Sequence, residues 1–190
     1  MIFNLTEETL TRAADILNAG GVVIIPTDTV YGIAAHPRHP EAVQRICTIK
    51  GRPTGKPIAL LAADMDAVVR FGAAFPDIAR RLAAKHWPGA LTLVLPCGGG
   101  YEGFRVPAHD AARRLIAACG GTLRVTSANL SGEMPALDAA EALREVGLEA
   151  DMVLDGGISP GGVASTVAKV EPDGTITVIR EGTVSIDEAF

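Results

Sequence analysis

The chain has 190 residues, of which 48% are hydrophobic and only 4% aromatic, and its formal net charge is −5. This length suits one domain with an aliphatic core, which we expect to span residues 1–190. The acidic balance argues against a protein that coats nucleic acid, and no apolar run approaches the ~20 residues of a membrane helix. An N-terminus without a basic region and three widely spaced cysteines predict a reducing, cytoplasmic location.

The N-terminal part of the chain reads as a helix, a buried strand and a polar loop. Thr6 followed by two glutamates is typical of a helix start, and leucine and alanine then recur at helical spacing up to Gly20. Residues 22–25 form a continuous β-branched run, which predicts a buried strand. The polar segment 26–32 follows at once, at the kind of position where α/β folds place ligand contacts.

The rest of the chain alternates irregularly between helices and strands. Helices are predicted at residues 41–49 after Pro40, in a short segment capped by Asp64, at 76–86, from a cap at Asp110 to about Cys119, and at 138–146. Strands are predicted at 58–61, 92–95, 104–106, 123–126, 152–154, 165–170 and 175–179, with a flexible connection at 98–100. Pro172-Asp173-Gly174 predicts a closing hairpin. This order favours an α/β or α+β fold with one mixed sheet.

A basic segment, residues 49–57, interrupts this acidic chain. It places Lys50, Arg52 and Lys56 within seven positions and contains no carboxylate. Two glycines and two prolines exclude a regular helix or a central strand. A solvated surface loop is one interpretation. We favour a shaped loop around an anion, because arginine offers phosphate a fork of donors and lysine a point charge.

Three other motifs do not lead to a site. Residues 157–161 match G-x-S-x-G, but Pro160 has no N–H for an oxyanion hole and all four histidines precede Ser159, so a serine hydrolase is rejected. His36 and His39 lack further metal ligands at suitable spacing. The glycine-rich stretches fit neither the Walker A nor the dinucleotide fingerprint.

The polar segments that survive lie at the ends of predicted strands. They are residues 27–31, 50–56, 105–107, 126–129, 165–166 and Arg180. Together they are rich in cations and hydroxyls and poor in general bases. This composition predicts positioning and electrostatic chemistry at phosphates rather than proton abstraction.

These segments resemble the Sua5/YciO/YrdC family, the threonylcarbamoyl-AMP synthases of tRNA modification. The matching pieces are PTDTVYG at 26–32, KGRPTGKP at 50–57, WPGALTLVL at 87–95, RVPAHD at 105–110, TSANLSG at 126–132, DGGISPGGVASTV at 155–167 and REG at 180–182. They follow the family's order over nearly the whole chain. The resemblance implies a twisted mixed sheet with flanking helices and a concave, positively charged cavity, and the length fits the short, single-domain form.

The resemblance also implies an activity. L-threonine, bicarbonate and ATP would give threonylcarbamoyl-AMP and pyrophosphate, with Mg²⁺ accompanying ATP and no metal held by the protein. A downstream transferase complex would then modify adenosine 37 of tRNAs that read ANN codons. Weak contact with tRNA is expected, and no contact with membranes.

By the same resemblance, residues of this chain receive roles. Thr29, Arg105 and Ser165 would bind threonine, and the expected ATP-binding residues are Arg52, Lys56, Ser127, Asn129 and Arg180. Lys50 and Arg52 would act as the catalytic cations.

Three positions depart from the family pattern, and two rival functions stay open. Lys56, Leu61 and Asp110 stand where many relatives carry Asn, His and Pro, and Leu61 puts one threonine contact in doubt. One rival is a non-catalytic module that binds double-stranded RNA or tRNA, for which the net charge is unfavourable. The other is the carbamoyl-transfer domain of hydrogenase maturation, which is embedded in a much longer chain with zinc-finger-like cysteines.

Overall fold

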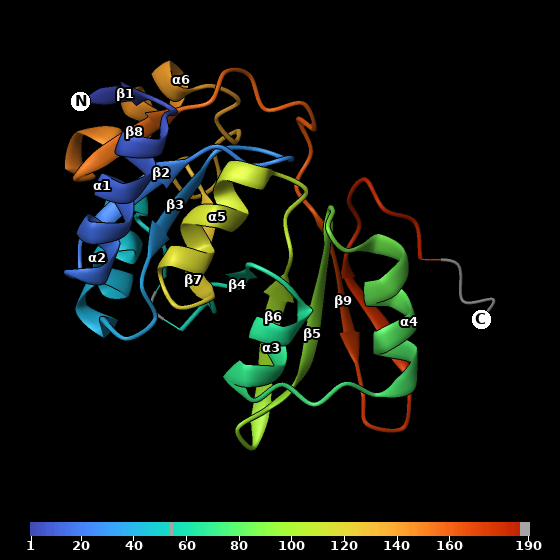
Figure 1. Ribbon diagram of the computed structural model, residues 1–190. Coiled ribbons are helices and arrows are strands. Elements are labelled where there is room, and N and C mark those ends of the chain that lie inside the picture. Colours follow the sequence, from blue (N-terminus) through green and yellow to red (C-terminus); the bar gives the residue numbers. More distant parts are fainter. Residues whose placement is uncertain (54, 187–190) are drawn as a thin grey trace.

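The computed structural model describes residues 1–53 and 55–186, and these residues form one continuous mixed sheet with helices around it (Figure 1). The strands are β1 (Ile2–Asn4), β2 (Val22–Ile25), β3 (Gly32–Ala35), β4 (Leu60–Ala62), β5 (Leu91–Cys97), β6 (Gly100–Arg105), β7 (Thr122–Ser127), β8 (Met152–Asp155), β9 (Thr166–Val170) and β10 (Ile176–Arg180). Their order across the sheet is β1-β8-β2-β3-β7-β4-β6-β5-β9-β10.

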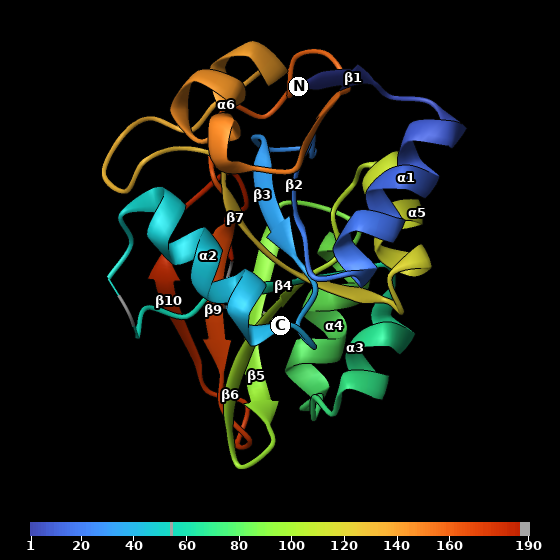
Figure 2. The ribbon, with the colours of Figure 1, turned by 90° about the vertical axis from the view of Figure 1, so that its left-hand side faces the viewer.

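Helices cover the two halves of the sheet differently. They are α1 (Glu7–Asn18), α2 (Pro40–Lys50), α3 (Met65–Phe71), α4 (Asp77–His86), α5 (Asp110–Ala118) and α6 (Ala139–Glu145), followed by a 3-10 turn (Gly147–Glu149). Around β2 and β3, α1 and α5 cover one face and α2 and α6 the other (Figure 2). Around β5 and β6, α3 and α4 pack on one face. The opposite face of the sheet at β5 and β6 carries Arg105 and Thr92, which belong to the candidate site described below.

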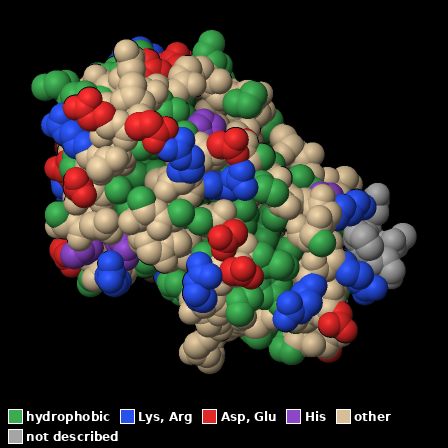
Figure 3. Space-filling model, in the orientation of Figure 1, with side chains coloured by type: hydrophobic (Ala, Val, Ile, Leu, Met, Phe, Trp, Pro, Cys, Tyr) green, Lys and Arg blue, Asp and Glu red, His purple; other side chains and the backbone are tan. Residues whose placement is uncertain are grey.

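The layering explains why β2 is apolar throughout. Val22 and Ile24 point toward α2 and α6, whereas Val23 and Ile25 point toward α1 and α5, and all four side chains are fully buried. Side chains alternate between the faces of a strand, so a strand covered on both faces needs no polar position. The surface is mixed in charge: on the face shown in Figure 3, basic and acidic side chains are interspersed.

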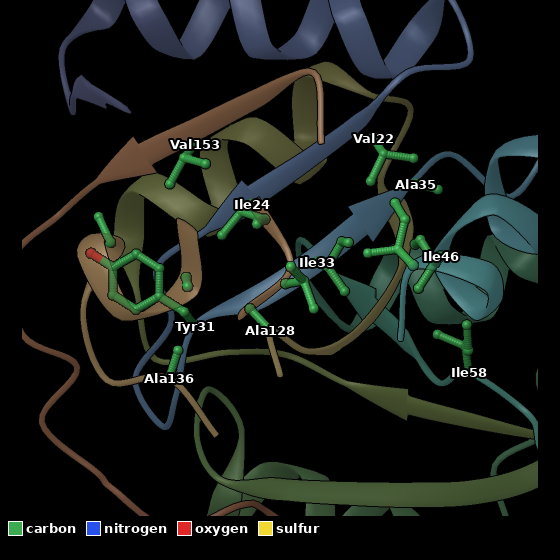
Figure 4. Packing of buried hydrophobic residues seen from close by; sticks show 14 of the residues in the cluster. Val22, Ile24, Tyr31, Ile33, Ala35, Ile46, Ile58, Ala128, Ala136 and Val153 are labelled. Carbon is green, nitrogen blue, oxygen red and sulfur yellow. The ribbon is translucent and has the colours of Figure 1, made fainter. Parts of the chain in front are cut away.

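Tyr31 anchors the polar segment 26–32 in the core. Its ring is fully buried among aliphatic residues of β2, β3 and β8 (Figure 4). Its hydroxyl donates to the carbonyl of Gly157 at 2.7 Å and accepts from the amide of Gly156 at 3.1 Å. The tyrosine therefore fixes the segment after β2 against the segment after β8.

Most predicted elements are confirmed within one or two residues. Thr6 caps α1 through the amide of Thr9, Asp64 caps α3, Pro40 is the first residue of α2, and β9 and β10 form the predicted hairpin. The fold class, a twisted mixed sheet with flanking helices, is also confirmed. Among the described helices, none is both long and apolar enough to cross a membrane.

Several boundaries were wrong, each for a local reason. The triglycine is not a flexible connection, because Cys97 pairs with Gly100 and the two glycines between them adopt the positive φ angles of a tight hairpin, 58° and 83°. Asp110 does not cap α5: His109 does, by accepting from the amide of Ala112. β1 and β3 were not predicted, since β1 is only three residues long and β3 is built from Gly, Ile and Ala.

We expect Tyr31→Phe to lower the free energy of unfolding by about 1–2 kcal/mol, because it removes both hydrogen bonds of a fully buried tyrosine. Urea unfolding measures the loss. Tyr101→Phe is the matched control, since among the described residues that hydroxyl, on an exposed tyrosine, bonds to the Glu171 side chain alone. An equal effect of the two variants would contradict the role assigned to Tyr31.

Candidate functional site

Arg105 is the last residue of β6 and lies on the face of the sheet opposite α3 and α4. Phe104, its neighbour, pairs with Leu93 under those helices, so Arg105 lies across from Thr92 on the other face. Thr92 in turn pairs with Val167, and Val167 with Arg180. The register thus places Arg105, Thr92 and Arg180 in one row, although they are far apart in sequence.

Three protein acceptors hold the buried guanidinium of Arg105, whose residue is 6% exposed. Nε donates to the carbonyl of Gly89 at 2.9 Å, Nη1 to Thr29 Oγ1 at 2.9 Å, and Nη2 to Asp28 Oδ1 at 2.5 Å. Burial lowers the pKa of Arg105, while the charge of Asp28 and its hydrogen bond oppose that shift. The predicted partners Thr29 and Arg105 are therefore brought together, with a carboxylate that the sequence analysis did not single out.

The turn that carries Asp28 and Thr29 is held by its own hydrogen bonds. Thr27 Oγ1 donates to the carbonyl of Val30 at 2.7 Å and accepts from the amide of Thr29 at 3.2 Å. Gly161 packs against this turn so closely that a Cβ there would lie 2.7 Å from the carbonyl oxygen of Asp28. Only glycine permits this contact.

Ser159, the serine of the G-x-S-x-G match, helps to hold the same turn. Its hydroxyl donates to the carbonyl of Thr27 at 3.0 Å, and its amide donates to the carbonyl of Leu137. Its residue is 5% exposed. The side chain therefore has a structural role in joining the segment after β8 to the turn after β2.

Ser165 lies just before β9 and joins two further side chains. Its hydroxyl is 2.8 Å from that of Thr92, next to Arg105 in the sheet. Arg180 donates to the carbonyl of Ser165 from Nε and Nη2, at 3.1 Å and 2.7 Å, and to its hydroxyl at 3.2 Å. Arg180, predicted among the ATP-binding residues, therefore lies beside the residues predicted for threonine. Thr92 was not predicted as a site residue.

Lys50 is the last residue of α2 and is 2% exposed, so the predicted loop starts only at Gly51. Its ammonium donates to the carbonyls of Ser127 and Asn129, both at 2.5 Å. Burial lowers its pKa to about 8, with a further contribution from the positive charges of Arg52 and Lys56. Lys50, Ser127 and Asn129 are therefore brought together as predicted, but through backbone carbonyls.

Asn129 has one side-chain atom left over. Nδ2 donates to the carbonyls of Leu130 and Glu133, both at 2.8 Å. Oδ1 is buried and has no partner within the described part of the chain. A buried acceptor of this kind is suited to a donor on a ligand, since leaving it unpaired costs free energy.

Arg52 bonds to its own loop. Nε donates to the carbonyl of Lys56 at 3.2 Å and Nη2 to that of Pro57 at 2.7 Å, while the Lys56 side chain is exposed. Thr54, in the same motif, lies outside the described residues. The positive charges of Arg52 and Lys56 both lower the pKa of Lys50. Their grouping around an anion stays a prediction.

The segment 26–32 connects these two groups of residues. Thr29 contacts Arg105, whereas the carbonyl of Tyr31 accepts from the amide of Ala128 at 2.8 Å and Gly32 pairs with Ser127. Two hollows of about 600 Å³ and 250 Å³ lie elsewhere, one beside α4 and the β9–β10 turn and one between α3, α4 and Val106. Neither is lined by a predicted site residue, so the concave cationic cavity stays a prediction.

Comparisons with known proteins show which family this chain is similar to. A sequence profile of the family described as "Telomere recombination" (Sua5_yciO_yrdC) matches residues 15–182. The chain is 38% identical over 173 residues to a threonylcarbamoyl-AMP synthase of Stenotrophomonas maltophilia (strain K279a), covering 84% of this chain and 91% of the relative. It is 33% identical over 190 residues to that of Bacillus subtilis (strain 168), covering 94% of this chain and 55% of the relative.

One solved structure is similar to nearly all of this chain. The crystal structure of P. abyssi Sua5 complexed with L-threonine has a TM-score of 0.89 and 32% identity, over 96% of this chain and 57% of that one. The chain thus spans little more than half of the B. subtilis and P. abyssi proteins. Because the profile covers most of the chain and the S. maltophilia relative aligns over most of both sequences, the chain belongs to the Sua5/YciO/YrdC family.

Proposed function

We propose that this chain is a threonylcarbamoyl-AMP synthase, which makes threonylcarbamoyl-AMP and pyrophosphate from L-threonine, bicarbonate and ATP. The observation that carries the proposal is the buried Arg105 with Thr29 on one side and the Thr92–Ser165 pair on the other. Relatives that align over most of the chain are named for this activity, and P. abyssi Sua5 was solved with L-threonine.

Arg105 is proposed to bind the threonine carboxylate by donating hydrogen bonds to it. A guanidinium has five N–H donors, and three of them bind Gly89, Thr29 and Asp28. Within the described residues one N–H is left without a partner on each Nη atom, so two donors are available to a carboxylate. Thr29 and Ser165 supply hydroxyls nearby, and these would contact the threonine hydroxyl.

The cations at the end of α2 are proposed to act on ATP. The carbamate formed from threonine and bicarbonate attacks the α-phosphorus through its carboxyl oxygen, and pyrophosphate leaves. Lys50 and Arg52, with Lys56, would stabilise the negative charge on the phosphates. Ser127, Asn129 and Arg180 would complete the nucleotide contacts. No protein nucleophile is required.

Magnesium is proposed to enter with the nucleotide as the MgATP substrate, coordinated largely by phosphate oxygens and water. Among the residues that the structure describes, no three His, Cys, Asp or Glu side chains gather as a metal site. The product would be passed to a transferase that modifies tRNA, and a weak contact with tRNA is part of the same proposal. A cytoplasmic location follows from that role.

Pyrophosphate release from ATP and bicarbonate, with and without L-threonine, tests this function directly. An RNA-binding module would show no threonine-dependent release, and a carbamoyl-transfer domain would use another carbamoyl acceptor or donor. Either result would overturn the proposal.

The hydroxyls of Thr29 and Ser165 predict that the enzyme reads the hydroxyl of threonine. Turnover with threonine should exceed turnover with the isosteric valine by on the order of 100-fold, because valine leaves buried polar groups unpaired. Formation of the carbamoyl-AMP adduct of each amino acid measures both rates. Equal rates would show that the pocket recognises shape alone.

Arg52→Lys should lower kcat/KM for ATP by roughly 30- to 1,000-fold, or about 2–4 kcal/mol, because lysine keeps the charge but not the planar fork. Arg81→Lys, the same change at an exposed arginine of α4 outside the site, is the control and should keep normal activity. Normal activity of the Arg52→Lys enzyme would mean that Arg52 does not bind phosphate and only stabilises its loop by bonding to the carbonyls of residues 56 and 57.

The pKa of Lys50, about 8, predicts that ATP affinity depends on pH. Lysine is charged below its pKa and neutral above it, so the attraction for phosphates weakens as pH rises. The Kd for ATP, measured by calorimetry, should increase roughly three- to ten-fold from pH 7 to pH 9. Lys50→Arg keeps its charge over this range and should show a flat profile. If the Kd for ATP changed with pH equally in the wild-type and Lys50→Arg proteins, the titration of Lys50 would be excluded as the cause.

A further inference from the structure

We propose that Asp28 recognises the α-amino group of the amino acid substrate, which makes the site selective for an α-amino acid over the corresponding α-hydroxy acid. This inference rests on the proposed function and names one more specificity-determining residue for it. It begins from the contact between Asp28 and Arg105, whose side chains are 12% and 7% exposed.

The carboxylate of Asp28 has unused hydrogen-bond acceptor positions. Among the described residues its side chain accepts one hydrogen bond, which Arg105 Nη2 donates to Oδ1 at 2.5 Å. A carboxylate has about four acceptor positions, so Oδ2 and part of Oδ1 are available to another donor. Gly161 and the hydrogen bonds of the Thr27 turn hold the backbone of Asp28, and the bond from Arg105 orients its carboxylate.

Charge balance indicates which ligand fits this pair. Arg105 and Asp28 together are neutral, and an amino acid zwitterion is neutral as well. If Arg105 takes the carboxylate through its two remaining N–H groups, the α-ammonium lies one carbon away and needs an anion. Burying it without one would be costly. Asp28 is the only carboxylate that bonds to Arg105 within the described residues.

The other charged groups near Asp28 do not replace it. His109 is close enough for Asp28 to raise its pKa against the effect of burial, but its Nδ1 caps α5 through the amide of Ala112. Arg180 contributes positive charge toward Arg105. Arg105 and Arg180 can therefore both attract the carboxylate of a ligand, whereas the counter-charge for its ammonium group is Asp28.

The test compares two ligands that differ at one group. Calorimetry without ATP measures the Kd of L-threonine and of 2,3-dihydroxybutanoate, which carries a hydroxyl in place of the amino group. Wild-type protein should bind threonine at least about ten-fold more tightly. In Asp28→Asn this preference should disappear, because threonine affinity falls while that of the hydroxy acid is unchanged or rises.

Two further variants separate recognition from structure. Asp28→Glu keeps the charge and should keep the preference for threonine, at reduced affinity. Glu102→Gln breaks a different arginine–carboxylate pair, with Arg124, and should leave the preference intact. Thermal unfolding of every variant shows which proteins are folded.

The outcomes are distinct. If Asp28→Asn weakens both ligands equally, or if Asp28→Glu loses the preference as Asp28→Asn does, Asp28 only holds Arg105 and the inference fails while the proposed function stands. If wild-type protein binds neither ligand and releases no pyrophosphate with threonine, the proposed function itself fails.

Discussion

The buried ion pair between Arg105 and Asp28 is the contact on which the site depends. Removing two charges from water costs several kcal/mol each, and their attraction offsets this only when the remaining donors and acceptors are also satisfied. Here the carbonyl of Gly89 and the hydroxyl of Thr29 take two further donors of the guanidinium. The pair joins the end of β6 to the turn after β2, and so couples the two halves of the sheet.

The second group of residues carries charge of one sign. Lys50 ends α2, Arg52 and Lys56 follow it in the loop, and the ammonium of Lys50 is buried against two carbonyl oxygens. Carbonyl dipoles stabilise a cation but do not neutralise it, so this end of the helix keeps a positive field. Such a fixed field is the kind of preorganised environment that favours developing negative charge on phosphates.

Two departures from the family pattern find a place in this structure. Leu61 pairs with Arg105 in the sheet and packs into the core beside α1 and α5. The residue at position 61 is therefore a direct neighbour of Arg105. Asp110 is the first residue of α5 and forms an ion pair with Arg113. An acid at a helix N-terminus is favourable, which gives Asp110 a local structural role.

The sequence alone determined most of the fold and part of the site, because those signals are local. Caps such as Thr6, the apolar run of β2 and the Pro/Gly framing of the basic loop depend on neighbours within a few residues. The sequence also placed Thr29, Arg105 and Ser165 in one functional group, through the family's motifs.

Only the tertiary structure decided which side chains meet. Asp28 was overlooked because nothing local distinguishes a carboxylate that pairs with an arginine 77 residues away from one that faces water. Thr92 joins the site only because β5 lies between β6 and β9, and Lys50 leaves the loop because its ammonium reaches carbonyls 77 and 79 residues further on. Contacts of this range follow from sheet order, register and burial, and no short window of sequence contains them.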